Sequence, residues 1–85
     1  MYKVLVSEKV EKGIKKIPIQ NAKKIVEKIN LLAENPRPFG YIKMSGFDNF
    51  YRIRVGIYRI IYTIEDEILT VEVVKIDHRR SVYKT

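Results

Sequence analysis

The chain has 85 residues and no cysteine, and its 17 lysine and arginine residues against 10 acidic residues give a formal net charge of +7 at pH 7. This length predicts a single domain with a small core. The lack of cysteine excludes disulfides and thiolate metal sites, and no long apolar segment is present, so we expect a soluble cytoplasmic protein without a membrane span. The charge favours a polyanionic partner such as nucleic acid or an acidic protein segment, although a merely soluble basic protein would have the same composition.

The first part of the chain predicts one strand and two helices. Residues 2–6 alternate weakly, as in a strand. Ser7 is a plausible N-cap for a short helix that Pro18 ends. Residues 19–34 predict a longer amphipathic helix, antiparallel to the first. Its apolar stripe, which we expect in the core, comprises Ala22, Ile25, Val26, Ile29, Leu32 and Ala33.

The remaining part of the chain predicts strands. Two prolines in residues 35–38 break the helix, and residues 41–44 form a short candidate strand. Residues 51–64 alternate with period two on either side of Gly56-Ile57, which indicates a β-hairpin. After a polar turn at residues 65–67, residues 68–76 are apolar on both faces, which is typical of a central strand.

Three arginines share one face of the predicted hairpin. If the tyrosine and isoleucine residues of both strands face the core, Arg52, Arg54 and Arg59 project together from the other side. Three clustered guanidinium groups suit an anion, while a solvated strand face would show the same alternation. The predicted fold is a two-layer α+β domain, in which an N-terminal strand and a helical hairpin pack on one face of a small antiparallel sheet. The other face stays open and bears the arginines.

Two segments resemble one known family. They are residues 43–46 with the Tyr-Arg strand pair of residues 51–62, and the ending Ile76-Asp77-His78-Arg79-Arg80-Ser81-Val82-Tyr83. Together, in this order, they resemble the RelE/ParE toxin superfamily, and the ending resembles its RelE branch of mRNA interferases. The resemblance covers essentially the whole chain and implies a single RelE-like toxin domain over residues 1–85.

The resemblance implies a toxin of a type II toxin–antitoxin system. Such a toxin enters the ribosomal A site and cleaves the exposed mRNA codon without a metal or any other cofactor. Its implied partners are a cognate antitoxin protein, the ribosome with its rRNA, and mRNA, with no membrane and no small-molecule cofactor. An acidic antitoxin segment would suit the charge of +7.

The resemblance also implies roles for individual residues. Cleavage by the RNA's own 2′-hydroxyl needs a base, cations around the phosphorane and an acid at the leaving oxygen. Arg59 and Arg79 match the family's phosphate-binding arginines, and Tyr83 matches the tyrosine that activates the 2′-hydroxyl. Surrounding cations favour a phenolate, which would make a tyrosine a better base. A C-terminal tyrosine that packs on the sheet edge is the structural alternative.

Arg52 and Arg54 stand where some relatives have lysine. Arginine keeps the charge but does not deprotonate, so Arg54 can stabilise phosphate and is a poor general acid. His78 is the only histidine, and histidine titrates near neutrality, which makes it a candidate acid or base. A surface or capping role is the alternative for a lone histidine at a strand end.

Other basic residues are candidates for RNA backbone contacts. These are Lys43, Lys75 and Arg80, for which a solvated surface is the alternative. Two rival functions stay open. One is a ParE-like inhibitor that binds DNA gyrase without chemistry of its own, and the other is a basic RNA-binding module whose catalytic activity has decayed.

Overall fold

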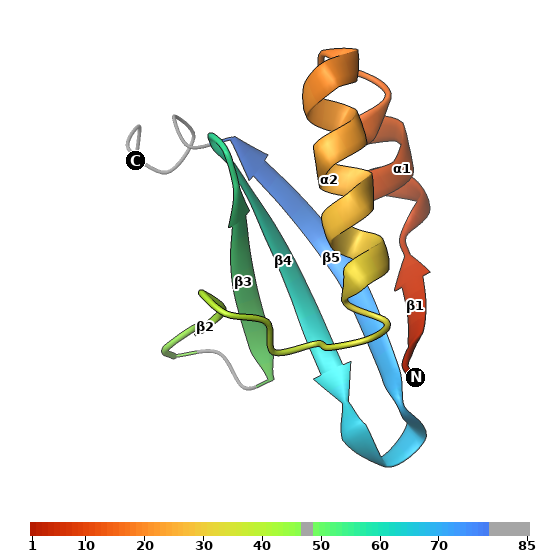
Figure 1. The fold of residues 1–85 in the computed structure, drawn as a ribbon, viewed down its shortest axis with the longest axis vertical. Helices are drawn as coiled ribbons and strands as arrows, with labels where there is room; N and C mark the ends of the chain where they lie inside the picture. Colours follow the sequence, from red (N-terminus) through yellow and green to blue (C-terminus); the bar gives the residue numbers. More distant parts are fainter. Residues whose placement is uncertain (47–48, 79–85) are drawn as a thin grey trace.

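The computed structural model describes residues 1–46 and 49–78. Their elements follow the order expected from the sequence, a strand, two helices and then further strands (Figure 1). The bounds are β1 Lys3–Val6, α1 Glu8–Ile14, α2 Ile19–Leu31, β2 Ile42–Lys43, β3 Phe50–Val55, β4 Tyr58–Glu65, a 3₁₀ helix at Asp66–Ile68, and β5 Thr70–His78. Within the described ranges, no helix has the length and hydropathy needed to cross a membrane.

The strands form one sheet in the order β1-β5-β4-β3-β2. The four later strands pair antiparallel with their neighbours, and β5 is a central strand, as predicted. The α+β class with two helices on a sheet is confirmed, but the sheet is mixed because β1 pairs in parallel with β5. The tight turns on which the antiparallel prediction rested fix only the later strands, and no such turn joins β1 to its partner.

The helices begin where the sequence predicts and end earlier. The Ser7 hydroxyl accepts a hydrogen bond from the Val10 amide at 3.2 Å, which caps α1. This helix ends at Ile14, and residues beyond it form a turn before α2. The predicted stripe of α2 is wider than the buried one, because Ile25 and Ile29 are buried while Val26 is 42% exposed.

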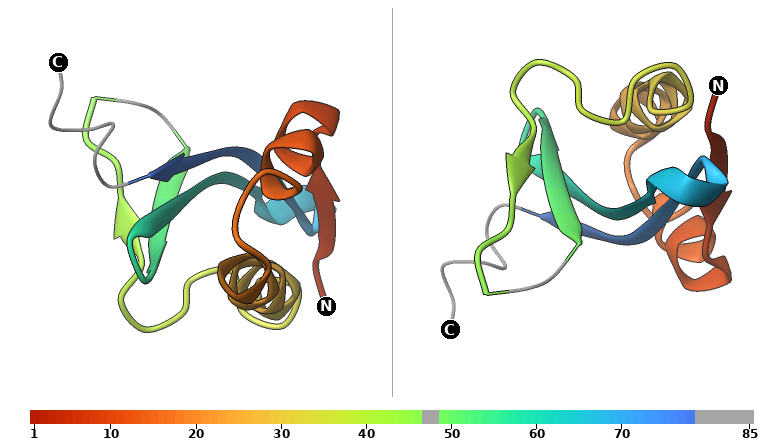
Figure 2. Two further views of the ribbon diagram at one scale, coloured as in Figure 1. Left: turned by 90° about the horizontal axis from the view of Figure 1, so that it is seen from above. Right: turned by 90° about the horizontal axis from the view of Figure 1, so that it is seen from below.

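Both helices contribute to one core on the sheet. Val10 of α1 and Ile25 and Ile29 of α2 pack with the buried tyrosine, isoleucine and valine residues of β3, β4 and β5. Tyr62 of β4 is fully buried, and its hydroxyl donates to the Pro36 carbonyl at 2.7 Å, so the polar group is satisfied. Figure 2 shows a strongly twisted sheet, with β2 and β3 on one side of the molecule and β1 on the other.

Two turns join the last three strands. Gly56 has φ +61° at the first position of the two-residue β3–β4 turn, as a type II′ hairpin turn requires. The β4–β5 connection is the 3₁₀ helix Asp66–Ile68, which is followed by Leu69 with φ +47°. Ile68 and Leu69 are therefore exposed turn residues and do not open the strand, as the apolar run had suggested.

Candidate functional site

The three arginines of the hairpin lie on one face of the sheet. Arg54 on β3 pairs directly with Arg59 on β4, and Arg52 lies two residues earlier on β3. Directly paired residues have Cβ atoms about 5 Å apart, and diagonal neighbours are still within reach of long side chains. Tyr51, Ile53 and Val55, which alternate with Arg52 and Arg54, are buried in the core on the other face. The structure thus brings the three side chains together, as the alternation predicts.

The three side chains differ in exposure. Arg54 is exposed, Arg52 is half-buried and Arg59 is buried with 7% of its surface accessible. The expectation of a uniformly open face is therefore wrong at Arg59. Arg59 lies on the interior strand β4, where it pairs with Arg54 of β3 and Asp77 of β5.

Positive charge in this cluster is not neutralised within the part of the chain that the structure describes. There, none of the three arginines forms an ion pair, and the buried Nε of Arg52 has no hydrogen-bond partner. The pKa of Arg52 is lowered, first by burial and then by repulsion from Arg59 and Arg54. Arginine nevertheless stays charged at neutral pH, so a bound anion would relieve both the repulsion and the missing hydrogen bond.

One carboxylate stands beside the cluster. Asp77 on β5 pairs with Arg59 in the sheet register, on the same face. Its Oδ1 is bound instead to the ammonium of Lys75 at 3.4 Å. Lys75 pairs with Ile61 and so extends the positive charge of this face onto β5. Asp77 was not among the residues predicted from the sequence, although alternation along β5 places it on this face.

Two further candidates lie away from the cluster. His78 pairs with Tyr58, and its ring meets the Tyr58 ring edge-on with centroids 5.2 Å apart. Because Tyr58 and Arg59 are consecutive strand residues, His78 lies on the opposite face from Arg59. Lys43 is exposed on the short edge strand β2, where it pairs with Tyr51. The remaining candidates, Arg79, Arg80 and Tyr83, lie outside the described residues.

A hollow next to the arginines contains a residue that was not predicted from the sequence. Phe39, which is 97% exposed, lines a cavity of about 270 Å³ with Ile42, Arg52 and Arg54. β2 pairs with β3 only at Tyr51 and Arg52, so the hollow lies where the edge of β3 becomes free. The sequence signal was Pro38-Phe39-Gly40, a turn that places an aromatic residue at its tip.

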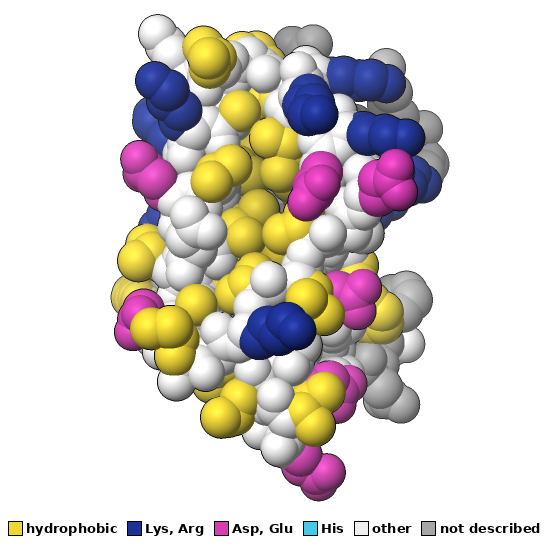
Figure 3. All heavy atoms as spheres, turned by 90° about the vertical axis from the view of Figure 1, so that its right-hand side faces the viewer, with side chains coloured by type: hydrophobic (Ala, Val, Ile, Leu, Met, Phe, Trp, Pro, Cys, Tyr) yellow, Lys and Arg dark blue, Asp and Glu magenta, His cyan; other side chains and the backbone are white. Residues whose placement is uncertain are grey.

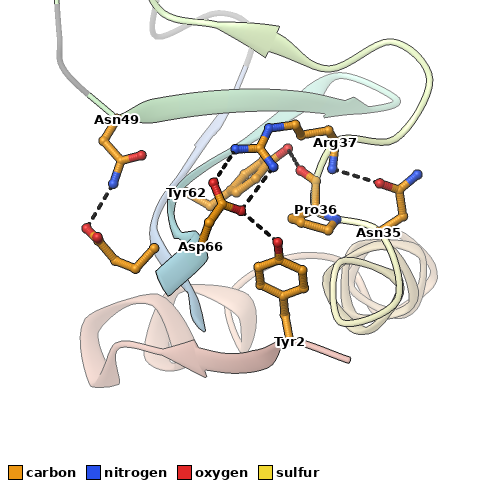
Figure 4. Close-up of polar contacts among 8 residues, drawn as sticks. Tyr2, Asn35, Pro36, Arg37, Asn49, Tyr62 and Asp66 are labelled. Carbon is orange, nitrogen blue, oxygen red and sulfur yellow. Dashed lines mark hydrogen bonds and ion pairs between the residues drawn. The ribbon is translucent and has the colours of Figure 1, made fainter. Parts of the chain in front are cut away.

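A fourth arginine near this region is fully engaged. Arg37 donates two hydrogen bonds to the Asp66 carboxylate at 3.2 and 2.8 Å, and the Tyr2 hydroxyl donates to the same carboxylate at 2.6 Å (Figure 4). The Arg37 guanidinium also lies 5.7 Å from the centre of the Tyr51 ring. These bonds lower the pKa of Asp66 to about 2, with the Arg37 contribution the largest.

The helical side of the molecule has a different surface. α2 exposes Ile19, Val26 and Leu31. Figure 3, which views the molecule from the right-hand side of Figure 1, shows apolar side chains among groups of both charge signs. This surface thus carries both charges, whereas Arg52, Arg54 and Arg59 adjoin one another on β3 and β4.

The fold and the charged face together define a small α+β domain with three arginines clustered on one face of its sheet. Residues 4–83 match the family described as the ParE toxin of type II toxin–antitoxin systems, parDE, and the chain belongs to this family. The chain is 34% identical over 88 residues to a protein named as a RelE1 toxin of Methanocaldococcus jannaschii, a match that covers 98% of this chain and 96% of the relative. The resemblance to the RelE/ParE superfamily, with a RelE-like chain, is thus confirmed.

Solved structures agree with this assignment. A chain of the archaeal RelE–RelB complex from Pyrococcus horikoshii matches with a TM-score of 0.82 and 28% identity, over 92% of this chain and 94% of that chain. The isolated RelE toxin of E. coli matches with a TM-score of 0.78 and 25% identity, over 98% of this chain and 92% of that one. The family match over residues 4–83 includes both helices and the arginine-bearing hairpin.

Proposed function

We propose that this protein is a ribosome-dependent endoribonuclease that cleaves mRNA in the A site, the toxin of a type II toxin–antitoxin pair. The observation that carries the proposal is the cluster of Arg52, Arg54 and Arg59 on one face, with no ion pair in the described part of the chain. Such a cluster opposes folding unless it binds an anion. A phosphodiester backbone supplies that anion.

The proposed reaction is attack by the RNA's own 2′-hydroxyl on the adjacent phosphate. The 2′-oxygen forms a bond to phosphorus as it loses its proton to a base, and the bond to the 5′-oxygen breaks as that oxygen gains a proton. The products are a 2′,3′-cyclic phosphate and a 5′-hydroxyl. Negative charge grows on the phosphorane oxygens during this step, so prepositioned cations lower the barrier.

The arginines divide this work by their exposure. Arg59 is buried beside Arg54, where a low dielectric strengthens its interaction with the phosphorane. Arg54 is exposed and meets the incoming phosphate, and Arg52 contributes a third guanidinium between solvent and core. The two remaining roles in the proposal come from the resemblance to the family. Tyr83 acts as the base, and Arg79 is a further phosphate ligand.

The proposed partners follow from charge and from the relatives. The net charge of +7 suits rRNA, mRNA and an acidic antitoxin segment. The relatives from Pyrococcus horikoshii and Methanococcus jannaschii were solved as RelE–RelB complexes, which supports a cognate antitoxin for this chain. Lys43, Lys75 and Arg80 are proposed contacts to the RNA backbone.

Primer extension on mRNA, with and without ribosomes, tests the proposal. The purified protein is expected to cut ribosome-bound mRNA at codon-phased positions and to leave free mRNA intact. Arg54→Ala should abolish most of this signal, while Lys12→Ala, which removes an equal charge from α1, should not. Equal cutting of free mRNA, or no cutting of programmed ribosomes, would contradict the proposal.

The family that matches is described as the ParE toxin, and this favours one alternative function enough to test it in parallel. A ParE-like inhibitor of DNA gyrase would trigger a DNA damage response without mRNA cuts. A decayed RNA-binding module is distinguished by Tyr83→Phe. If the Tyr83→Phe variant inhibits growth as strongly as the wild type, Tyr83 is not the base of the reaction.

A further inference from the structure

Phe39 is held at the tip of a well-anchored turn. The Tyr41 amide donates to the Pro38 carbonyl at 3.0 Å, and Gly40 has φ +92°, which fits a type II turn with Phe39 at its first central position. The turn therefore directs Phe39 outward, and 97% of its surface is exposed. A single exposed aromatic ring is ordinary on a protein surface, so it is the hollow lined by Phe39 that points to a ligand.

The segment before this turn is fixed at two points. The Pro36 carbonyl accepts the buried Tyr62 hydroxyl at 2.7 Å. Arg37 is bound to Asp66 and lies over the Tyr51 ring. Figures 1 and 4 show this connection as it crosses from α2 to β2. The ring of Phe39 is thus carried by a braced segment, which reduces the entropy lost when it binds a ligand.

The hollow beside Phe39 combines an aromatic ring with cations. Arg52, Arg54 and Lys28 line it together with Phe39 and Ile42, and among the described residues its lining contains no acidic side chain. Its volume of about 270 Å³ is just below the range of about 300–1,000 Å³ that is usual for drug-sized ligands. It suits one flat ring with an attached anionic group.

We propose that this hollow binds one nucleotide of single-stranded RNA, with the base stacked on Phe39 and its phosphate between Arg52 and Arg54. The inference rests on the proposed function and adds a base contact at Phe39 to the phosphate contacts proposed there for Arg52 and Arg54. Aromatic stacking combined with a basic groove is how proteins hold unpaired bases. An apolar peptide side chain in the same hollow would leave Lys28 and both arginines desolvated without a counter-charge.

A single tryptophan reports on this contact directly. The sequence contains no tryptophan, so Phe39→Trp introduces the only one and keeps a stacking ring. Ile19→Trp, at a position on α2 that is 72% exposed, is the matched control. The probes are a 2′-O-methyl oligoribonucleotide, ribosomes whose A-site codon carries a non-cleavable 2′-deoxy nucleotide, and ribosomes without mRNA.

The proposal predicts that RNA quenches the tryptophan emission of the Phe39→Trp variant and leaves that of the Ile19→Trp variant unchanged. Quenching that requires the codon identifies an mRNA base, and quenching with ribosomes lacking mRNA identifies an rRNA base; both outcomes support the stacked nucleotide. In cleavage assays, Phe39→Ala should raise KM roughly tenfold with kcat little changed, and Phe39→Trp should restore KM. Thermal denaturation checks that each variant folds.

Three results would overturn the inference. One is unchanged tryptophan emission of the Phe39→Trp variant in every RNA complex. Another is a wild-type KM for Phe39→Ala. The third is weaker antitoxin binding by Phe39→Ala without any effect on RNA, which would identify a protein-docking surface. If the wild type cleaves no mRNA, the proposed function fails on its own, and the oligoribonucleotide titration still decides the stacking site by quenching or its absence.

Discussion

Arg37 and Arg59 show two opposite uses of the same side chain. Arg37 has a bidentate carboxylate partner and an aromatic ring beneath it, although its side chain is partly exposed. Arg59 is buried between Arg54 on one neighbouring strand and Asp77 on the other, and in the described part of the chain it forms no ion pair. The first arrangement stabilises the folded chain, and the second weakens it. The difference agrees with the proposal that Arg59 binds the phosphate of the substrate.

The largest expected effect separates these two residues. Arg59→Met removes a buried charge and keeps much of the side-chain volume. Single-turnover cleavage on programmed ribosomes should slow by a factor on the order of 10³, because the phosphorane loses a fixed cation. The melting temperature should stay the same or rise, because a buried charge that repels Arg54 has been removed. A lower melting temperature with normal cleavage would reverse the assignment of Arg59.

A second substitution tests the exposed member of the cluster. Arg54→Ala should slow the same single-turnover step by a factor on the order of 10². The pKa of Arg52 should also return toward its ordinary value, since one repelling neighbour is gone. Lys12→Ala serves as the control for the loss of one positive charge. A rate within twofold of the wild type would reject a phosphate-stabilising role for Arg54.

Arg37→Met should have the opposite effects to Arg59→Met, with lower stability and nearly normal cleavage. The ion pair with Asp66 is lost while the aliphatic part can still pack on Tyr51, so the melting temperature should fall by several degrees. Cleavage at saturating ribosome concentration should stay within about threefold of the wild type. Circular dichroism during heating measures the first quantity. Unchanged stability together with lost cleavage would contradict the assignment of Arg37 to the stability of the fold.

Acid should weaken the Arg37 network selectively. The pKa of Asp66 in the folded chain is about 2, below its ordinary value near 4, so the stabilisation is complete above about pH 4 and disappears as the pH falls through about 2. Asp66→Asn should therefore be less stable than the wild type at pH 7 and nearly equal to it at pH 2. Urea unfolding at both pH values measures the difference in free energy of unfolding between the variant and the wild type. The same difference at pH 7 and pH 2 would exclude the ionised carboxylate as the cause.

The smallest expected effect on cleavage is at His78. Its ring packs on Tyr58, on the face away from the arginines, so His78→Gln should leave the pH–rate profile unchanged. Loss of the aromatic pair should cost about 1 kcal/mol of stability. The disappearance of an inflection near neutrality would restore the hypothesis of an acid or base at this position.

Alternation and turn chemistry made most of the fold predictable from the sequence. Gly56 marked the hairpin, Ser7 marked the start of α1, and period two placed three arginines on one face. These are local signals, and tertiary context decided the rest. The parallel pairing of β1 with β5, the burial of Arg59 and the exposure of Val26 depend on which elements meet.

The candidate site was likewise predictable only where local patterns determine it. Residue type and alternation sufficed for the arginine cluster, and alternation also placed His78 on the other face once Tyr58 was known to pair with it. Phe39 was missed because a proline-rich connection has no periodicity from which its exposure could be inferred. The partnership of Arg37 with Asp66 joins residues 29 positions apart, which no local pattern reveals.

The position of β1 beside β5 also bears on when the protein can become harmful to the cell that makes it. The strand β1 pairs with residues 70–73, which are synthesised after both helices and the β3–β4 hairpin. Pairings between such distant segments form slowly and late. A growing chain therefore has no finished sheet on which to display its arginines until residues 70–73 have been synthesised.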